Sequence, residues 1–350
     1  AIAHVDLYLF FDIDIAMLAL EVHASDLPLA TVQEVMFRLG RTYPTYWDEA
    51  GQAGHCAHKV ELIGTGGAVL SRSDYHDREK YLAYVCENRA ARVATHWQYL
   101  LQPMVPHHSK QPGALRYTQL EYHRMPQMVF ASTAAGTTLS REDYVRLAFA
   151  SGNATADGQE VLPFSDSHLA DFEKRFCYDR YFRQRCAVEW PESRYMSSGH
   201  ALVVTGDARD ALFTGLTTGC LNSFRHEHFL LFLIAHFHKA ALLMFSDRLT
   251  EAMSRLDVHD ARTVRSFRAA SREALDTFLR FTHRYWFHVV SNQPLMHDLF
   301  NLTRDHLDLA RLYEDIRQEL HSMSDFLENE ALRKQNDGMT RLTVVTTLGL

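Results

Sequence analysis

Histidine is the residue type whose abundance and spacing first suggest chemistry in this sequence. The chain has 21 histidines in 350 residues, and His226, His228, His236 and His238 fall within one predicted helix. His228 and His236 are eight residues apart, about two helical turns, so they lie on roughly one face. Zinc needs three or four such groups converging at about 2 Å. Because H-x-H alone does not supply them, we interpret these residues as packed or surface histidines.

A loop containing His55, Cys56 and His58 could also supply metal ligands, but no second half of a Cys/His site is evident. The five cysteines are scattered and include no C-x-x-C pair. This usage is typical of buried free thiols in a reducing compartment. The sequence therefore leaves the metal-binding residues unknown.

Catalytic and nucleotide-binding motifs are absent from the sequence. It contains no G-x-S-x-G, no Walker loop and no G-x-G-x-x-G. The glycine-rich run at residues 64–67 lacks the following Lys-Ser/Thr, so it predicts a turn. We expect a protein that is not an enzyme and uses no organic cofactor. A metal-dependent hydrolase built on the histidine-rich helix is kept as a third hypothesis.

Acidic side chains gather near the end of the chain. A solvated helix face explains most of them, but such a surface also suits hard divalent cations, which bind oxygen ligands and often keep their waters. The net charge of −7 and the pI of about 6.3 argue against nucleic acid as a partner. The acidic residues are Asp305, Asp308, Glu314, Asp315, Glu319, Asp325, Glu328 and Glu330.

Residues 294–350 are predicted to form one long helix; about fifty residues of continuous helix would be roughly 75 Å long, at about 1.5 Å per residue. The last charges are Arg333, Lys334, Asp337 and Arg341, after which the sequence is apolar. Basic residues ahead of an apolar run are typical of the cytoplasmic flank of a membrane span. We therefore expect a stalk that leads toward a membrane. One face of this helix has an apolar residue at steps of three and four: Leu309, Leu312, Ile316, Leu320, Met323 and Leu327.

Two further helices are predicted at residues 222–256 and 257–290. The first is apolar from Phe229 to Phe245 but contains His236, His238 and Lys239. A membrane span needs about 20 predominantly apolar residues and tolerates such groups poorly. We therefore expect a helix buried between neighbours. Short connections imply that these two helices and the stalk pack antiparallel.

Residues 1–210 mix predicted strands and helices, which indicates an α/β layered domain. Strands are expected at 5–22 (one or two), 59–64, 127–136 and 194–207. Asp26 is expected to cap a helix over 27–42, and Ser140 starts another with a capping pattern. Residues 77–103 are helical or end in a strand, 151–163 are a loop, and 166–182 are helical. The fold class is α/β, divided into an α/β domain at 1–210, an antiparallel helix pair at 211–293 and the stalk at 294–350.

The end of the chain carries a recognisable pattern, NDGMTRLTVVTT at residues 336–347. It resembles the end of the stalk helix and the start of the first transmembrane helix in the CorA family of divalent-cation transporters. RYWFHVVSNQ at 284–293 and LYEDIRQELHSMSDFLENEALRKQ at 312–335 resemble the stretches that flank the turn into that stalk. The resemblance covers about the last 130 residues. The first 200 or so match only in layout, an α/β/α cytoplasmic domain.

The resemblance implies a homopentameric funnel at the cell inner membrane, with five stalk helices around a pore and this portion cytoplasmic. At the matching positions, Asn336, Met339, Leu342, Thr346 and Leu350 would face the axis, and their spacing keeps them on one helical face. Asn336 would touch a hydrated ion through water, whereas Met339 and Leu342 would narrow the pore and exclude water. The stripe could instead be the seam of a helical bundle.

The resemblance also implies that the substrate and regulator is a divalent cation, with Mg²⁺ favoured over Zn²⁺ or Co²⁺. Cations bound between subunits would hold the funnel closed, and their loss would let it open. The Gly-Met-Asn signature of the family is absent, so we expect the native chain to continue past Leu350, through which it would meet the membrane. The competing hypothesis is a soluble coiled-coil scaffold or binding protein whose native chain ends near Leu350.

Overall fold

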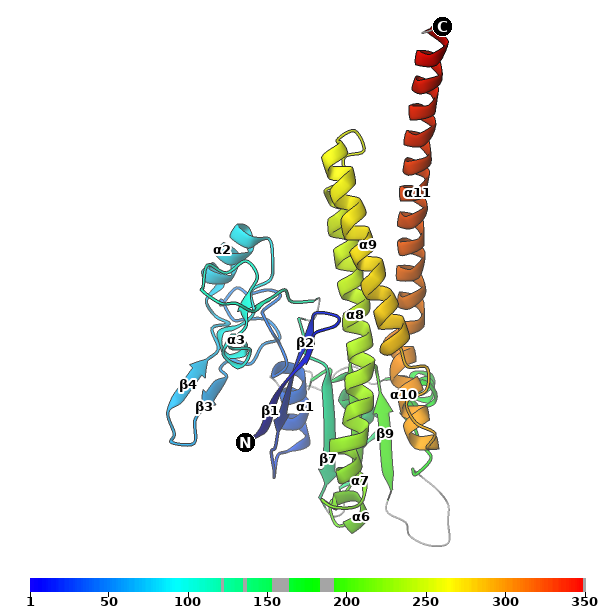
Figure 1. The fold of residues 1–350 in the computed structure, drawn as a ribbon. Helices are drawn as coiled ribbons and strands as arrows, with labels where there is room; N and C mark the ends of the chain where they lie inside the picture. Colours follow the sequence, from blue (N-terminus) through cyan, green and yellow to red (C-terminus); the bar gives the residue numbers. More distant parts are fainter. Residues whose placement is uncertain (121–122, 135–136, 153–163, 183–191, 349–350) are drawn as a thin grey trace. The chain divides into compact units, whose positions relative to one another are not determined.

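The computed structural model describes residues 1–120, 123–134, 137–152, 164–182 and 192–348, and in the last helix it describes side chains as far as residue 329. Contacts between Cα atoms divide the chain into two units, each described here by itself. Figure 1 shows the helices and strands of both units. Unit 1 comprises Ala1–Leu9, Ala16–His236 and Val289–Leu307, and unit 2 comprises Phe10–Ile15, Phe237–His288 and Asp308–Leu350.

The centre of unit 1 is a four-stranded mixed sheet in the order β7–β10–β9–β8. β10 pairs in parallel with β7, where Val203 lies opposite Val129, and antiparallel with β9, where Val203 lies opposite Met196. β10 is buried along almost its whole length, as expected for a central strand covered on both faces. The strands are β7 (Gln127–Thr133), β8 (Cys177–Tyr178), β9 (Ser193–Ser197) and β10 (Ala201–Asp207).

Helices cover both faces of this sheet. On one face, Val203 packs in a cluster with residues of α1, α4 and α5. On the other face, Leu202 and Val204 pack with residues of α6, α8 and α10. Alternate residues of β10 therefore face opposite helix layers, which confirms the α/β/α arrangement. The helices are α1 (Leu29–Arg38), α4 (Arg141–Phe149), α5 (Asp166–Phe176), α6 (Ala211–Thr214), α8 (Phe229–Ser254) and α10 (Pro294–His306).

Residues 194–207, predicted as one strand, form the hairpin of β9 and β10 instead. Ser198 N donates to Ala201 O at 3.0 Å across the turn. Gly199 has a φ of +78°, and a Cβ at this position would lie 2.9 Å from the backbone of His306. Glycine is the residue that adopts this conformation without a steric penalty. The prediction was wrong because strand-forming residues on both sides of Gly199 hide the reversal.

The other predicted elements of unit 1 are present with altered ends. Residues 5–22 form a two-stranded ribbon, and residues 77–103 form two helices without a strand. The capping box of α4 is confirmed, with Asp143 N donating to Ser140 Oγ at 3.1 Å. Residues 153–163 of the predicted loop lie outside the described residues. The remaining elements are β1 (Ile2–Phe10), β2 (Ile15–Val22), β3 (Glu61–Ile63), β4 (Val69–Arg72), β5 (Val105–Pro106), β6 (Arg116–Tyr117), α2 (Arg78–Asn88) and α3 (Thr95–Leu100).

Asp26 does not cap α1, contrary to the prediction. The N-cap is Pro28, which makes no side-chain cap hydrogen bond, and Asp26 itself has a left-handed φ of +57°. The residue before a proline is disfavoured in helical conformation. The helix therefore starts only after Pro28, too far along the chain for Asp26 to reach its first free N–H groups.

Unit 2 contains three long helices: α8 from Phe237 onward, α9 (Ala261–Arg284) and α11 (Leu309–Leu348). α11 packs on α9 and continues beyond the turn that joins α8 to α9 (Figure 1). The apolar face predicted for α11 is buried at Leu309, Ile316, Leu320 and Met323. The spacing of apolar residues therefore identified the packing face correctly.

The continuous helix predicted over residues 294–350 is interrupted. α10 ends at His306 and α11 begins at Leu309, because Asp308 has a left-handed φ of +56°. The 40 residues of α11 span about 60 Å rather than 75 Å. Aspartate adopts the left-handed region more readily than most residues. Because an aspartate makes this break, the sequence has no glycine or proline there to mark it.

The apolar helix predicted at residues 222–256 begins with α7 (Cys220–Ser223) and a π-helical turn at Phe224–His228, which lead into α8. This stretch, Cys220–Ser254, is the one helix in the described part of the chain that is long and apolar enough to cross a membrane by length and composition. Of its most apolar window, 61% is buried inside the chain. The predicted burial is confirmed, and core helices of soluble proteins have the same composition.

Candidate functional site

The predicted pore stripe falls in the distal part of α11, where the structure describes only the backbone. Asn336, Met339, Leu342 and Thr346 lie within this helix, and their side chains are outside the described residues. Leu350 lies beyond the last described residue, Leu348. The backbone is thus helical through four of the five positions, and the direction in which they face stays a prediction.

The base of α11 is held by an aromatic cluster in unit 2. The ring of Tyr313 stacks on that of Trp286, with 4.6 Å between centroids, and on that of Phe278, with 5.4 Å. Phe281 of α9 is fully buried, 5.7 Å from Trp286 and 5.8 Å from Phe245 of α8. Aromatic pairs at these separations contribute about 0.5–1.5 kcal/mol beyond the burial of their area. The packing therefore couples α11 firmly to α8 and α9.

The turn between β1 and β2 belongs to the same unit and binds α8 and α9. Asp12 Oδ2 accepts hydrogen bonds from Tyr285 OH at 2.9 Å and from Arg284 Nη1 at 2.8 Å, and these lower the pKa of Asp12. Asp14 forms an ion pair of 3.0 Å with Arg248. We did not predict this role from the sequence. A β-ribbon turn with two nearby carboxylates was the only signal available.

Much of the acidic character at the start of α11 is neutralised within the helix. Arg311 pairs with Asp308 at 2.5 Å and with Asp315 at 3.8 Å. Arg317 and a neighbouring glutamine donate to Glu314, and these hydrogen bonds lower the pKa of Glu314 to about 2. Ion pairs on such an exposed surface contribute little to stability. Their main effect here is to occupy carboxylate oxygens that a cation would otherwise use.

Two members of the predicted histidine-rich helix have different environments. His226 is exposed, and its Nδ1 lies 2.8 Å from the carbonyl oxygen of Asn222. His228 is fully buried with its ring edge-on to that of Tyr195, at 5.6 Å between centroids. Neither ring nitrogen of His228 has a hydrogen-bond partner among the described residues. Burial lowers the pKa of His228 to about 4, so its ring is neutral near pH 7.

The other two histidines of this helix bond to backbone carbonyls. His236 Nε2 donates to Gly199 O at 3.1 Å, and His238 Nε2 donates to Tyr285 O at 2.5 Å. Across the part of the chain that the structure describes, no group of three or more His, Cys, Asp or Glu side chains is arranged to hold a metal ion. The interpretation of His228, His236 and His238 as packed histidines is therefore confirmed, and His226 lies on the surface.

The loop with His55, Cys56 and His58 does not present a set of ligands either. Cys56 is buried, which raises the pKa of its thiol to about 12. His58 Nδ1 lies 3.3 Å from Gln52 Oε1, and the ring of His58 contacts that of His76 with 4.9 Å between centroids. Metals bind the thiolate rather than the thiol, so Cys56 is a poor ligand near neutral pH.

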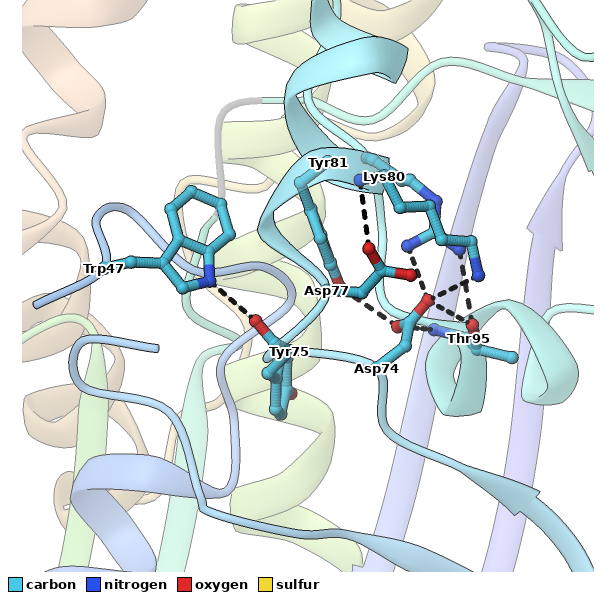
Figure 2. Close-up of polar contacts among 8 residues, drawn as sticks. Trp47, Asp74, Tyr75, Asp77, Lys80, Tyr81 and Thr95 are labelled. Atoms are coloured by element: carbon cyan, nitrogen blue, oxygen red, sulfur yellow. Dashed lines mark hydrogen bonds and ion pairs between the residues drawn. The ribbon is translucent and has the colours of Figure 1, made fainter. Parts of the chain in front are cut away.

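Asp74 is the centre of a polar network in unit 1 (Figure 2). Its carboxylate accepts from Thr95 N at 3.0 Å, Thr95 Oγ1 at 2.7 Å, Lys80 Nζ at 3.0 Å and Tyr81 OH at 3.1 Å. Arg92 Nη1 lies 2.7 Å from the same carboxylate. Burial opposes the charge of Asp74, but the hydrogen bonds from Thr95 and Lys80 and the charge of Arg92 outweigh it and lower the pKa.

With both oxygens occupied, Asp74 joins the start of α2 to the start of α3. Asp77 caps α2 by accepting from Lys80 N at 3.1 Å. Every polar atom of the Asp74 carboxylate has a partner within the chain, so it has little capacity left for a ligand. Sequence reasoning missed the network, and its signal was a pair of aspartates just before a helical segment.

Beside this network, buried aromatic residues fix the backbone at Arg41. Tyr75 OH and Trp97 Nε1 both donate to the carbonyl oxygen of Arg41, at 2.5 and 2.7 Å. His96 is fully buried edge-on against the ring of Tyr75, and burial lowers the pKa of His96 to about 4. The side chain of Arg41 is only 6% exposed. The backbone contacts therefore place a buried guanidinium in a defined position.

We expect acid to destabilise the protein through His96 and His228. Their pKa values of about 4 in the folded state lie below the 6.5 of an unperturbed histidine. The unfolded chain therefore takes up these protons first, so the free energy of unfolding falls as the pH drops from about 6.5 toward 4. The expected loss at pH 4.5 is about 2–3 kcal/mol for each residue.

Urea unfolding at pH 7 and pH 4.5 measures this loss. His228→Phe removes one titrating group, so its stability should fall less on acidification than that of the parent chain. His226→Phe, at an exposed histidine two residues away, should keep the parental acid sensitivity. Equal acid losses in the parent chain and His228→Phe would contradict the prediction.

In the described part of the chain, the base of α11 is firmly packed and the Asp74 carboxylate is fully hydrogen-bonded. No group of three or more His, Cys, Asp or Glu side chains there is arranged to hold a metal ion. Comparison with protein-family models, curated proteins and solved structures gave no match to this chain.

Proposed function

We propose that the chain is the cytoplasmic portion of a homopentameric divalent-cation channel or transporter, with α11 as the stalk. The observation that carries the proposal is α11 itself. It is a 40-residue helix whose base packs on α9 and whose distal part continues past the α8–α9 turn. A helix of this length exceeds what its own unit needs for packing. The CorA-like sequence at residues 336–347 lies in its distal part.

The packing at the base of α11 supplies a mechanism for gating. The stacked rings of Tyr313 and Trp286 tie α11 to the end of α9, so displacement of α9 would move the stalk as a lever. Packed interfaces of this kind switch between discrete arrangements rather than deforming continuously. Met339 and Leu342 would act at the far end of the lever by narrowing the pore and excluding water.

Regulation by cations would then involve carboxylates from more than one subunit. Glu319 and Glu328 are exposed on α11 and have no ion-pair partner among the described residues. Within the described part of one chain, no group of three or more possible ligands is brought together, but Mg²⁺ keeps several waters and is commonly bound through one or two carboxylates. Five chains around an axis would bring such residues together, with Mg²⁺ favoured over Zn²⁺ or Co²⁺.

The proposal predicts that Met339→Ala in the full-length protein raises cation leak when the channel is held closed by Mg²⁺. Removing the side chain from all five subunits widens the constriction and lets water enter. A barrier lower by about 1.4 kcal/mol would raise the leak about tenfold. Mg²⁺ influx into liposomes loaded with a fluorescent indicator measures it.

Thr340→Ala is the matched control, since residue 340 lies about 100° around the helix from residue 339. It should leave the leak unchanged. Equal leak in Met339→Ala and the parent protein would remove Met339 from the pore. A stable assembly that shows no flux under any condition would favour the alternative, a soluble coiled-coil scaffold.

A further inference from the structure

Three arginines of unit 1 surround a single phenylalanine ring. The guanidinium carbons of Arg38, Arg41 and Arg124 lie 5.6, 4.9 and 5.9 Å from the centroid of the Phe37 ring. Arg41 and Arg124 are also paired directly through an isolated antiparallel β-bridge. Two segments far apart in the sequence, after α1 and before β7, are thereby held together. We call these three side chains, with the histidines described below, the arginine cluster.

Two of these charges have no acidic partner among the residues that the structure describes. Arg41 Nε donates to Phe37 O at 3.1 Å, and Arg124 Nη2 donates to Ala150 O at 2.5 Å. Arg124 Nε is buried without any hydrogen-bond partner among the described residues. Neither Arg41 nor Arg124 lies within ion-pair distance of a carboxylate in the part of the chain that the structure describes. Arg38 differs, because Glu34 pairs with it at 2.5 Å.

Two histidines complete the arginine cluster on its exposed side. Arg41 Nη1 donates to His123 Nε2 at 2.9 Å, so this nitrogen of His123 is unprotonated. The ring of His55 lies 5.1 Å from that of Phe37. Burial and the neighbouring arginines lower the pKa values of both histidines. Both side chains are exposed. Because Arg41 Nη1 contacts His123 and Arg124 is only half-buried, the arginine cluster borders the surface.

Buried charge without a counter-charge is costly for a folded protein. Burial and repulsion from Arg41 lower the pKa of Arg124 to about 10, which still leaves it charged at neutral pH. Within the described ranges, two positive charges without a carboxylate partner therefore lie next to each other. Meanwhile Tyr75 and Trp97 hold the backbone of Arg41 in place. A fixed, unpaired pair of guanidinium groups is a preorganised receptor for an oxyanion.

We propose that the arginine cluster binds a phosphate group. Two unpaired guanidiniums match a ligand with two negative charges, and a phosphate monoester carries about −1.5 to −2 near pH 7, whereas a carboxylate carries one. The planar donors of Arg41 and Arg124 suit the oxygen edges of phosphate. His55 and His123 supply further ring nitrogens at the rim. This binding activity is separate from the proposed cation transport and does not depend on it.

Thermal unfolding of the whole chain with inorganic phosphate tests the proposal. Potassium phosphate at 10 mM, compared with potassium chloride at the same ionic strength and pH, should raise the Tm by about 2 °C or more. Arg41→Gln and Arg124→Gln should each weaken phosphate binding, measured by isothermal titration calorimetry, at least about tenfold. Arg78→Gln, at an exposed arginine of α2 in the same unit, should bind as the parent chain does.

The Tm of the variants without phosphate distinguishes a binding role of the arginines from a structural one. In phosphate-free buffer, Arg41→Gln and Arg124→Gln should unfold at the parental Tm or above it, because each removes a charge without a carboxylate partner among the described residues, from a buried position at Arg41 and a half-buried one at Arg124. A phosphate response no larger than that to chloride would overturn the proposal. The proposal would also be overturned if both variants responded to phosphate as the parent chain does. Sedimentation with vesicles containing phosphatidic acid, against phosphatidylcholine alone, distinguishes a lipid headgroup from a soluble phosphate.

Discussion

Replacing Asp74 by alanine is expected to lower the free energy of unfolding of unit 1 by about 3 kcal/mol. The carboxylate is 16% exposed and its partner Arg92 is 8% exposed, so little water can replace the lost contacts. Removal leaves Arg92 without its counter-charge and leaves Thr95 N and Oγ1 without their acceptor. A buried charge that loses its partner is among the most destabilising changes that a single substitution makes.

Hydrogen exchange followed by mass spectrometry measures this effect locally. The amides of α2 and α3 should exchange on the order of 100-fold faster in Asp74→Ala. Asp77→Ala removes only the cap of α2 and should cost about 1 kcal/mol. Glu79→Ala, at an exposed position on α2, should change stability by less than about 0.5 kcal/mol. If Asp74→Ala behaved like Glu79→Ala, the network would have no structural role.

Phe281→Ala is expected to destabilise unit 2 by about 3–5 kcal/mol, the cost of emptying a buried phenylalanine site. The side chain is fully buried, and its ring lies within 6.4 Å of five others: Phe237, His238, Phe245, Phe278 and Trp286. The first three rings belong to α8 and Phe278 belongs to α9. Trp286 follows α9 and stacks on Tyr313 of α11. The cavity would therefore loosen the base of the stalk as well as α9.

Amide hydrogen exchange in α8, α9 and the start of α11 measures this loosening. Phe281→Leu should lower the free energy of unfolding much less than Phe281→Ala, because leucine keeps most of the buried side-chain volume. Leu279→Ala, two residues away and 45% exposed, should be close to neutral. If α9 were destabilised while the start of α11 kept its protection, the coupling of the stalk to this cluster would be wrong, and the gating mechanism with it.

The main elements of this protein could be predicted from local patterns. Strand-forming runs identified β3 and β7, and the Ser140 capping box marked the start of α4. The spacing of apolar residues on α11 identified the face that is buried from Leu309 to Met323. These predictions succeeded because the signals depend on residues within a few positions of one another.

The failures lie where a single residue changes the course of the backbone. Asp308 interrupts the long helix with a left-handed φ, and the turn at Gly199 separates two strands predicted as one. Asp26 was placed as a cap although Pro28 delays the start of α1. In each case one residue's φ decides the outcome. Tertiary packing, not propensity, selects among the values that the residue can adopt.

The candidate sites show the same division. Sequence alone determined the fold class and the burial of the apolar helix at residues 222–256. The transport proposal rests on a sequence resemblance at residues 336–347, which stays a prediction. Only the tertiary structure decided which polar residues meet. Asp74 reaches Arg92 and Thr95, about twenty residues away, and Arg41 lies beside Arg124, 83 residues away. A charge's partner depends on distance in space, because Coulomb interaction and hydrogen bonding act over a few ångströms. The number of residues between two positions does not predict their distance in space when they lie in separate elements.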